Sequence, residues 1–174
     1  MATAVALPVT IALLAVAVHA GHRAAAGTPA PASPAGRPTA SVPAGPVRLA
    51  APPRTATIDR YCADLVAALP ITLDGLHSRP AQSTSPWVGA WGDPAVTFRC
   101  GVPKPAGFGP TSALQVVNGV QWYYQQRHGA VVFTVVDRPV YVELTVPERY
   151  SGAPLSGVTA AVAHSLPSRP LDVP

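Results

Sequence analysis

Charged residues are scarce in this chain of 174 residues, where they make up 11% of the sequence against the quarter that is usual in soluble domains. Lysine occurs once, yet the formal net charge is +4. The excess comes from four arginines among residues 1–54, which contain no Asp or Glu, while the rest of the chain carries eight basic and eight acidic residues. A nucleic-acid-binding domain would concentrate Lys and Arg on one face of its fold. We therefore expect no nucleic-acid partner.

Cysteine is also rare, with two residues at Cys62 and Cys100 and no C-x-x-C pair. This scarcity disfavours a redox-active dithiol and a zinc site. After residue 54 the histidines are His77, His128 and His164, and none has the H-x-x-x-H spacing of metal ligands. The chain also lacks a glycine-rich phosphate loop and a paired carboxylate motif. We assign no catalytic residue, no metal ligand and no cofactor.

The chain begins with a nearly uncharged apolar run over residues 1–20. At about 1.5 Å per residue, this run approaches the short limit for a helix that crosses a bilayer. It predicts either a secretory signal peptide, with Val18-His19-Ala20 as the cleavage site, or an uncleaved membrane anchor. A buried core helix is a third interpretation, which the absence of an amphipathic face disfavours. Arg23 after the run argues for a cytoplasmic domain by the positive-inside rule, but long domains translocate largely regardless of flanking charge.

Residues 21–54 are predicted to be a disordered linker rich in proline and alanine. Eight of the residues from Gly27 to Arg54 are proline, mixed with Ala, Gly, Ser and Thr. Such a composition cannot bury enough apolar surface to offset the ordering of the chain. Proline-rich segments extend at about 3.1 Å per residue, so the linker would hold a domain away from a membrane. A peptide ligand for a proline-binding module is the alternative.

Residues 55–174 are predicted to form the folded domain, which begins and ends with a helix. In "TIDRYCADLVAALP" the apolar residues recur at helical spacing, with Thr57 as the expected cap and Pro70 as the terminator. The second helix is expected over Pro154–Leu166, where apolar residues again share one face.

Between the helices the pattern is typical of strands. Asn118-Gly119 predicts a hairpin, because both positions of such a turn need a positive φ. "VYVELTV" alternates strictly between apolar and other residues, as in a strand with one buried face. The expected strands are Ala95–Cys100, Leu114–Val117, Val120–Gln126, Val131–Val136 and Val140–Val146. The fold class is therefore α+β: a two-layer domain in which two helices cover one face of an antiparallel sheet of about four to five strands.

Two alternatives remain for the cysteines, which are 38 positions apart. Two free buried thiols would fit a reducing compartment. A Cys62–Cys100 disulfide fits an exported chain, because disulfides persist in oxidising environments. The export-like N-terminal run favours the disulfide. We accordingly expect a protein of the cell membrane with its domain on the extracytoplasmic side, or a secreted protein after signal cleavage.

Several segments together resemble the domain of unknown function 3515 family, a group of small envelope-associated proteins found mainly in actinobacteria. The resemblance covers about Asp59 to Leu166 and rests on four segments and the closing helix: "CADLVAALP", "WGDPAVTFRCGVPKP", "VNGVQW" and "FTVVDRPVYVELTVP". It implies an envelope location, and it implies no mechanism, because the family has no established activity. Members typically carry an N-terminal membrane segment, some as lipoproteins, but this chain has no lipobox cysteine.

The candidate binding residues are Trp91, Asp93, Arg99, Trp122 and Arg138. A structural interpretation places Trp91 in the core, and Arg99 opposite to Cys100 on its strand. Arg99 is then expected to pair with Asp93, or to bind an anion together with Arg138. The functional hypothesis is an exposed groove of Trp91, Asp93, Arg99 and Trp122 that binds a cell-wall polymer or an envelope protein without catalysis. The alternative is an extracellular hydrolase with an unrecognised site.

Overall fold

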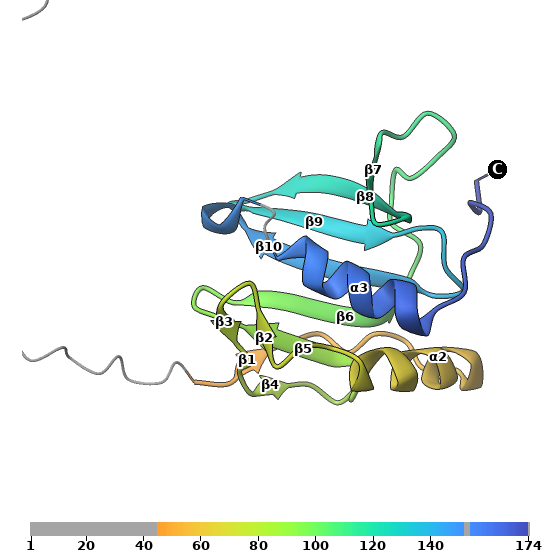
Figure 1. Cartoon of the computed structure of the whole chain (residues 1–174). Helices are drawn as coiled ribbons and strands as arrows, with labels where there is room; N and C mark the ends of the chain where they lie inside the picture. Colours follow the sequence, from red (N-terminus) through yellow and green to blue (C-terminus); the bar gives the residue numbers. More distant parts are fainter. Residues whose placement is uncertain (1–44, 152–153, 174) are drawn as a thin grey trace, which may run out of the picture. The chain divides into compact units, whose positions relative to one another are not determined.

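A computed structural model describes residues 45–151 and 154–173 of the chain. Its main feature is a six-stranded, antiparallel sheet in the order β5-β6-β10-β9-β8-β7, with helices α2 and α3 on one face (Figure 1). The sheet strands are β5 (Val88–Trp91), β6 (Val96–Val102), β7 (Leu114–Val117), β8 (Val120–Arg127), β9 (Ala130–Val135) and β10 (Tyr141–Pro147). This architecture confirms the predicted mixed α+β class.

The two helices form where the apolar periodicity predicts them. Helix α2 (Ala56–Ala67) begins after Thr55, whose hydroxyl accepts a hydrogen bond from the Ile58 amide, so the cap lies two residues before the expected Thr57. Helix α3 (Leu155–Ser165) follows a short 3-10 helix, η1 (Glu148–Tyr150). Helix α2 contacts β6 and α3, and α3 contacts β7 and β8. The core lies between the helices and this face of the sheet.

Side chains alternate between the two faces of the sheet, and the helix-covered face carries the core. The largest fully buried side chains come from both helices and from the inward positions of the strands. They include Leu65, Val96, Phe98, Val120, Trp122, Val135, Val142, Leu144, Val146, Val158 and Val162. Neither α2 nor α3, the two α-helices of the described residues, covers the opposite face, which we call the open face (Figure 1).

Two predictions about the extent of the fold are wrong. The sheet has six strands rather than four to five, because β5 was not expected. The fold also starts before Thr55, inside the predicted linker. Strand β1 (Val47–Arg48) pairs in parallel with β4 (Ala81–Gln82), and Pro52 is buried. A further two-stranded sheet consists of β2 (Thr72–Leu73) and β3 (Leu76–His77).

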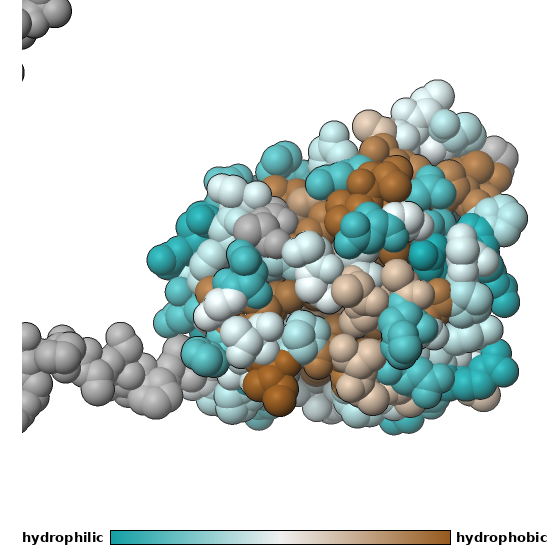
Figure 2. Space-filling model, in the orientation of Figure 1, coloured by the Kyte–Doolittle hydropathy of each residue, from teal (hydrophilic) through white to brown (hydrophobic). Residues whose placement is uncertain are grey.

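The two edges of the main sheet differ. The outer side of β5 is covered, because the Arg79 amide donates to the Ala90 carbonyl and the Gly92 amide donates to the His77 carbonyl. At the other edge, no strand among the described residues pairs with the outer side of β7. Apolar surface gathers where β7 and β8 lie (Figure 2), and Val116 on β7 is 63% exposed.

The predicted membrane segment, residues 1–20, and most of the predicted linker lie outside the described residues. Within residues 45–151 and 154–173, neither helix has the length and apolar character that spanning a bilayer requires.

Candidate functional site

The candidate site is built on a row of side chains that crosses the open face. Strand register aligns Val88 on β5, Arg99 on β6, Glu143 on β10, Thr134 on β9, Tyr123 on β8 and Leu114 on β7. Residues in direct register on one face of a sheet have Cβ atoms about 5 Å apart. The row therefore brings charged and hydroxyl groups together from strands that are distant in sequence.

Arg99 and Glu143 form the central ion pair of this row. The Nε and Nη2 atoms of Arg99 both donate to Glu143 Oε1, at 3.0 and 2.7 Å. The two side chains are 27% and 19% exposed, so water still reaches the pair. An ion pair of this kind contributes about 1 kcal/mol or less to stability.

A loop over residues 103–109 lies across this part of the open face. Gln125 on β8 anchors the loop, because its Nε2 donates to the Ala106 carbonyl at 3.0 Å. Phe108, which is buried, packs on Tyr123 with the ring centroids 5.5 Å apart. Pro103 and Pro105 stiffen the loop because each fixes its own φ.

Between this loop and the sheet lies a cavity of about 360 Å³, which we call the Arg99 cavity. Its lining comes from four strands and the loop: Arg99, Val102, Pro103, Pro105, Ala106, Gln125, Arg127, Val132, Thr134 and Glu143. The Arg127 Nη2 donates to the Gln125 amide oxygen at 3.0 Å. Since Arg99 and Glu143 balance each other, Arg127 leaves the lining with a net positive charge.

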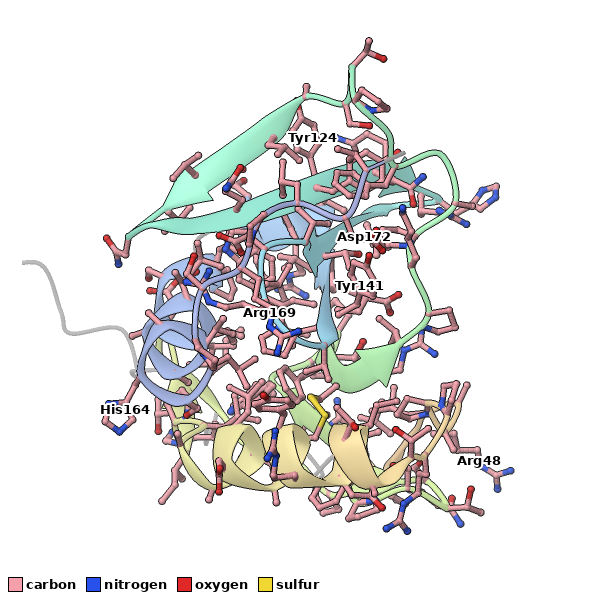
Figure 3. All side chains as sticks on the ribbon, turned by 90° about the vertical axis from the view of Figure 1, so that its right-hand side faces the viewer. Arg48, Tyr124, Tyr141, His164, Arg169 and Asp172 are labelled. Atoms are coloured by element: carbon pink, nitrogen blue, oxygen red, sulfur yellow. A yellow bond between two sulfur atoms is a disulfide. The ribbon has the colours of Figure 1, made fainter. Side chains whose placement is uncertain are left out.

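The opposite face of β6 carries the disulfide, which confirms the predicted Cys62–Cys100 pairing. Both cysteines are fully buried, and the bond ties α2 to the sheet (Figure 3). The next residue, Gly101, has a φ of +85°, and a Cβ there would overlap with Ile58 of α2. Consecutive residues of β6 thus serve two purposes: Arg99 lines the cavity, and Cys100 and Gly101 hold the helix.

The predicted groove of Trp91, Asp93, Arg99 and Trp122 is not present, because both tryptophans lie on the helix-covered face. Trp91 is 3% exposed and its Nε1 donates to the Pro70 carbonyl at 2.9 Å. Trp122 is fully buried and packs edge-on against Phe133. The structural interpretation of Trp91 as a core residue is therefore confirmed.

The predicted partners of Arg99 are also wrong. Asp93 is exposed in the β5–β6 turn, where its carboxylate lies 3.4 Å from Arg79. Arg138 lies between β9 and β10, where its Nη1 is 2.8 Å from the carboxylate of Asp137 and both side chains are almost completely buried. Arg99 pairs with Glu143 because the register places them directly opposite each other.

Three residues of the lining, Glu143, Gln125 and Arg127, were not predicted as site residues from the sequence. Glu143 did carry a signal, since it is the charged residue in the alternating strand "VYVELTV" and points away from the buried positions. Gln125 and Arg127 share a face of β8 by the same alternation. Their convergence on Arg99 depends on strand order, which no local pattern indicates.

Two ionisable groups away from the cavity have shifted pKa values. The hydrogen bond from the Arg54 guanidinium, and then the bond from the Trp87 indole, lower the pKa of Asp59. Burial, and then the nearby Asp172 carboxylate, raise the pKa of Tyr141. Tyr141 and Asp172 lie close together where the C-terminal segment passes the sheet (Figure 3).

The fold and the site define a small α+β domain stapled by one disulfide, with a polar, mixed-charge cavity on the open face of its sheet. The chain belongs to the family described as "Protein of unknown function (DUF3515)", whose model matches residues 1–171. No curated protein and no solved structure matches the chain.

Proposed function

We propose that this protein is a membrane-tethered or secreted protein of the cell envelope, and that its domain binds another envelope component without catalysing a reaction. The binding site is the Arg99 cavity. The observation that carries the proposal is this cavity itself: it measures about 360 Å³, lies on the open face of the sheet, and has an arginine of the W-G-D-P…R-C-G-V-P motif in its lining.

The disulfide supports the extracytoplasmic location. Cytosolic thiols are kept reduced, whereas disulfides persist in secreted and envelope proteins. The apolar run of residues 1–20 supplies a route to export, as a signal peptide or as an anchor.

The composition of the cavity supports binding of a polar partner. Ligand sites hold a few polar groups that fix orientation within a pocket of about 300–1,000 Å³. Here Glu143 is bonded through Oε1, which leaves Oε2 for a donor, and Arg127 supplies donors for an acceptor. A partner that carries both a carboxylate and hydrogen-bond donors matches these groups.

The test is photocrosslinking in intact cells. A photoreactive amino acid replaces Ala106, which is exposed and lines the cavity, and the matched control carries it at Ile71, which is 79% exposed and does not line the cavity. We expect a discrete adduct from position 106 that Arg99→Met abolishes. Because the Arg99–Glu143 pair is partly exposed, Arg99→Met should lower the unfolding free energy by only about 1 kcal/mol.

Equal adducts from positions 106 and 71, or an adduct that persists in Arg99→Met, would show that the cavity is not the binding site. The location is tested separately, by digestion of intact cells with a protease that does not cross the membrane. Protection of the domain under these conditions would contradict the extracytoplasmic placement.

A further inference from the structure

A second cavity, of about 440 Å³, lies on the helix-covered face of the sheet, beyond the part that α3 packs against. We call it the Tyr124 cavity. Its lining comes from β7 to β10 and the segment that follows: Gln115, Tyr124, Gln126, Val131, Phe133, Val146, Pro147, Glu148 and Ser151. It shares no lining residue with the Arg99 cavity.

The floor of the Tyr124 cavity is apolar, and one of its walls is aromatic. Register places Gln126, Val131 and Val146 in one cross-strand row, with Tyr124 and Phe133 in the next. The rings of Tyr124 and Phe133 lie 6.4 Å apart. Tyr124 is 42% exposed although its neighbour Phe133 is buried, so part of an aromatic ring is available to a ligand. Figure 3 shows Tyr124 at the end of the molecule opposite α2.

The rim of the cavity is polar and weakly charged. Gln115 on β7 and Gln126 on β8 contribute amides, each with two donors and one acceptor oxygen. Among the described residues, neither amide group hydrogen-bonds to another side chain or to the backbone, in contrast to Gln125 on the other face. Glu148 is the one charged residue in the lining, which contains no Lys or Arg.

We propose that the Tyr124 cavity binds a neutral saccharide. A sugar ring has an apolar C–H face and a rim of hydroxyls that both donate and accept hydrogen bonds. The electron-rich face of an aromatic ring attracts the C–H face, and the amides and the carboxylate of the rim satisfy the hydroxyls. The carboxylate of Glu148 disfavours an anionic ligand, and four polar side chains around the apolar floor disfavour a purely apolar one.

The proposal is independent of the Arg99 cavity and adds a second, separate binding site to the domain. It assigns a stacking role to Tyr124 and hydrogen-bonding roles to Gln115, Gln126 and Glu148. Because Tyr124 is the exposed aromatic group of the cavity, its ring is expected to contribute the largest share of the affinity, as buried aromatic anchors do in other binding sites.

The experiment is ligand-observed NMR on the full-length chain in a detergent without a sugar headgroup. The probes are β-1,4-linked pentamers of N-acetylglucosamine and of glucose. We expect saturable binding of at least one probe, with the strongest saturation transfer to its ring C–H protons. Tyr124→Ala should weaken that binding about tenfold or more, whereas Tyr124→Phe, which keeps the ring, should stay within about threefold of the wild type.

Two controls separate this site from the Arg99 cavity and from loss of fold. Tyr123→Phe changes the neighbouring tyrosine, on the opposite face of β8, and Arg99→Met changes the other cavity; neither should alter saccharide binding. The thermal unfolding transition of each variant establishes that it is folded. Absence of binding to both probes, equal binding by Tyr124→Ala, or equal loss in Arg99→Met would each overturn the proposal. Because the crosslinking test at position 106 does not depend on Tyr124, the two proposals fail separately.

Discussion

Loss of the Cys62–Cys100 disulfide should remove a large part of the stability of the domain. The bond closes a loop across a sequence separation of 38 residues, and the chain-entropy model assigns about 4 kcal/mol to a loop of this length at 25 °C. Both sulfur atoms are fully buried, so Cys62→Ala/Cys100→Ala also leaves two small voids, each worth about 1 kcal/mol. The expected loss in the double variant is therefore about 5–6 kcal/mol, against the 5–15 kcal/mol that is typical of a whole domain.

Urea unfolding followed by tryptophan fluorescence measures this loss, because Trp91 and Trp122 are buried in the core. With an m-value of about 1.5 kcal/mol/M, a loss of 4 kcal/mol lowers the midpoint by about 2.7 M. Reduction of the wild-type protein should produce this shift while the sulfur atoms are retained, and the double variant should be shifted further. Reductant added to the double variant is the control and should change nothing.

Two results would refute this reasoning. A midpoint that moves by less than about 0.7 M on reduction would show that the crosslink contributes less than about 1 kcal/mol. Recovery of two free thiols after alkylation of the native protein, without reductant, would show that the bond is not formed at all.

Three further predictions follow from the described contacts. Gly101→Ala places a side chain on a left-handed backbone and against α2, so it should lower the free energy of unfolding in urea by about 2–5 kcal/mol. In the control, Gly109→Ala, the added methyl group meets open space, and the loss should stay under about 0.5 kcal/mol. Equal losses in the two variants would contradict the overlap with α2. Arg138→Met should lower the free energy of unfolding by about 3–5 kcal/mol, because it leaves the buried Asp137 carboxylate without its partner. Adding Asp137→Asn removes that charge and should recover part of the loss, and no recovery would contradict the pairing. The carboxyl of Asp59 should titrate in NMR below its ordinary pKa, because its arginine and then its tryptophan partner lower that pKa. The ionised carboxyl then contributes to stability above the unfolded-state pKa of about 3.9, and this contribution is lost as the pH falls through the lower folded-state pKa. A folded-state pKa at or above the ordinary value for aspartate would contradict these contacts.

The sequence predicted those helices and strands whose characteristic pattern lies within one short stretch of the chain. The apolar stripe from Ile58 to Leu69 marked α2, and the Asn118-Gly119 turn marked the β7–β8 hairpin, where both residues have a positive φ. The alternation in "VYVELTV" marked β10 and its buried face. Strand β5 was missed because "VGAW" is short and contains a glycine, so it shows no clear period of two. Strand β1 was missed because its two residues lie in a proline-rich tract and pair with β4, over thirty positions away.

The candidate site was harder to predict than the fold because it depends on register. Arg99 and Glu143 are 44 positions apart and meet only because β6 pairs with β10, in a ladder that shifts between Tyr141 and Val142. A slip of one residue would move every side chain of β10 to the other face. Trp91 and Trp122 were expected in a groove with Arg99, but their side chains lie on the helix-covered face of the sheet and pack in the core, whereas Arg99 lies on the open face.

The difference between the two edges of the sheet has a consequence for how the molecule behaves at high concentration. Strand β5 cannot receive another chain, because residues 77–79 already bond to its outer side. Within residues 45–151 and 154–173 no strand pairs with the outer side of β7, which also carries the exposed Val116, and such an edge can template pairing with a further strand. Growth of the sheet is therefore possible in one direction only. Two copies that join through β7 would each block the other's free edge, so this association would stop at a pair and would not continue into a filament.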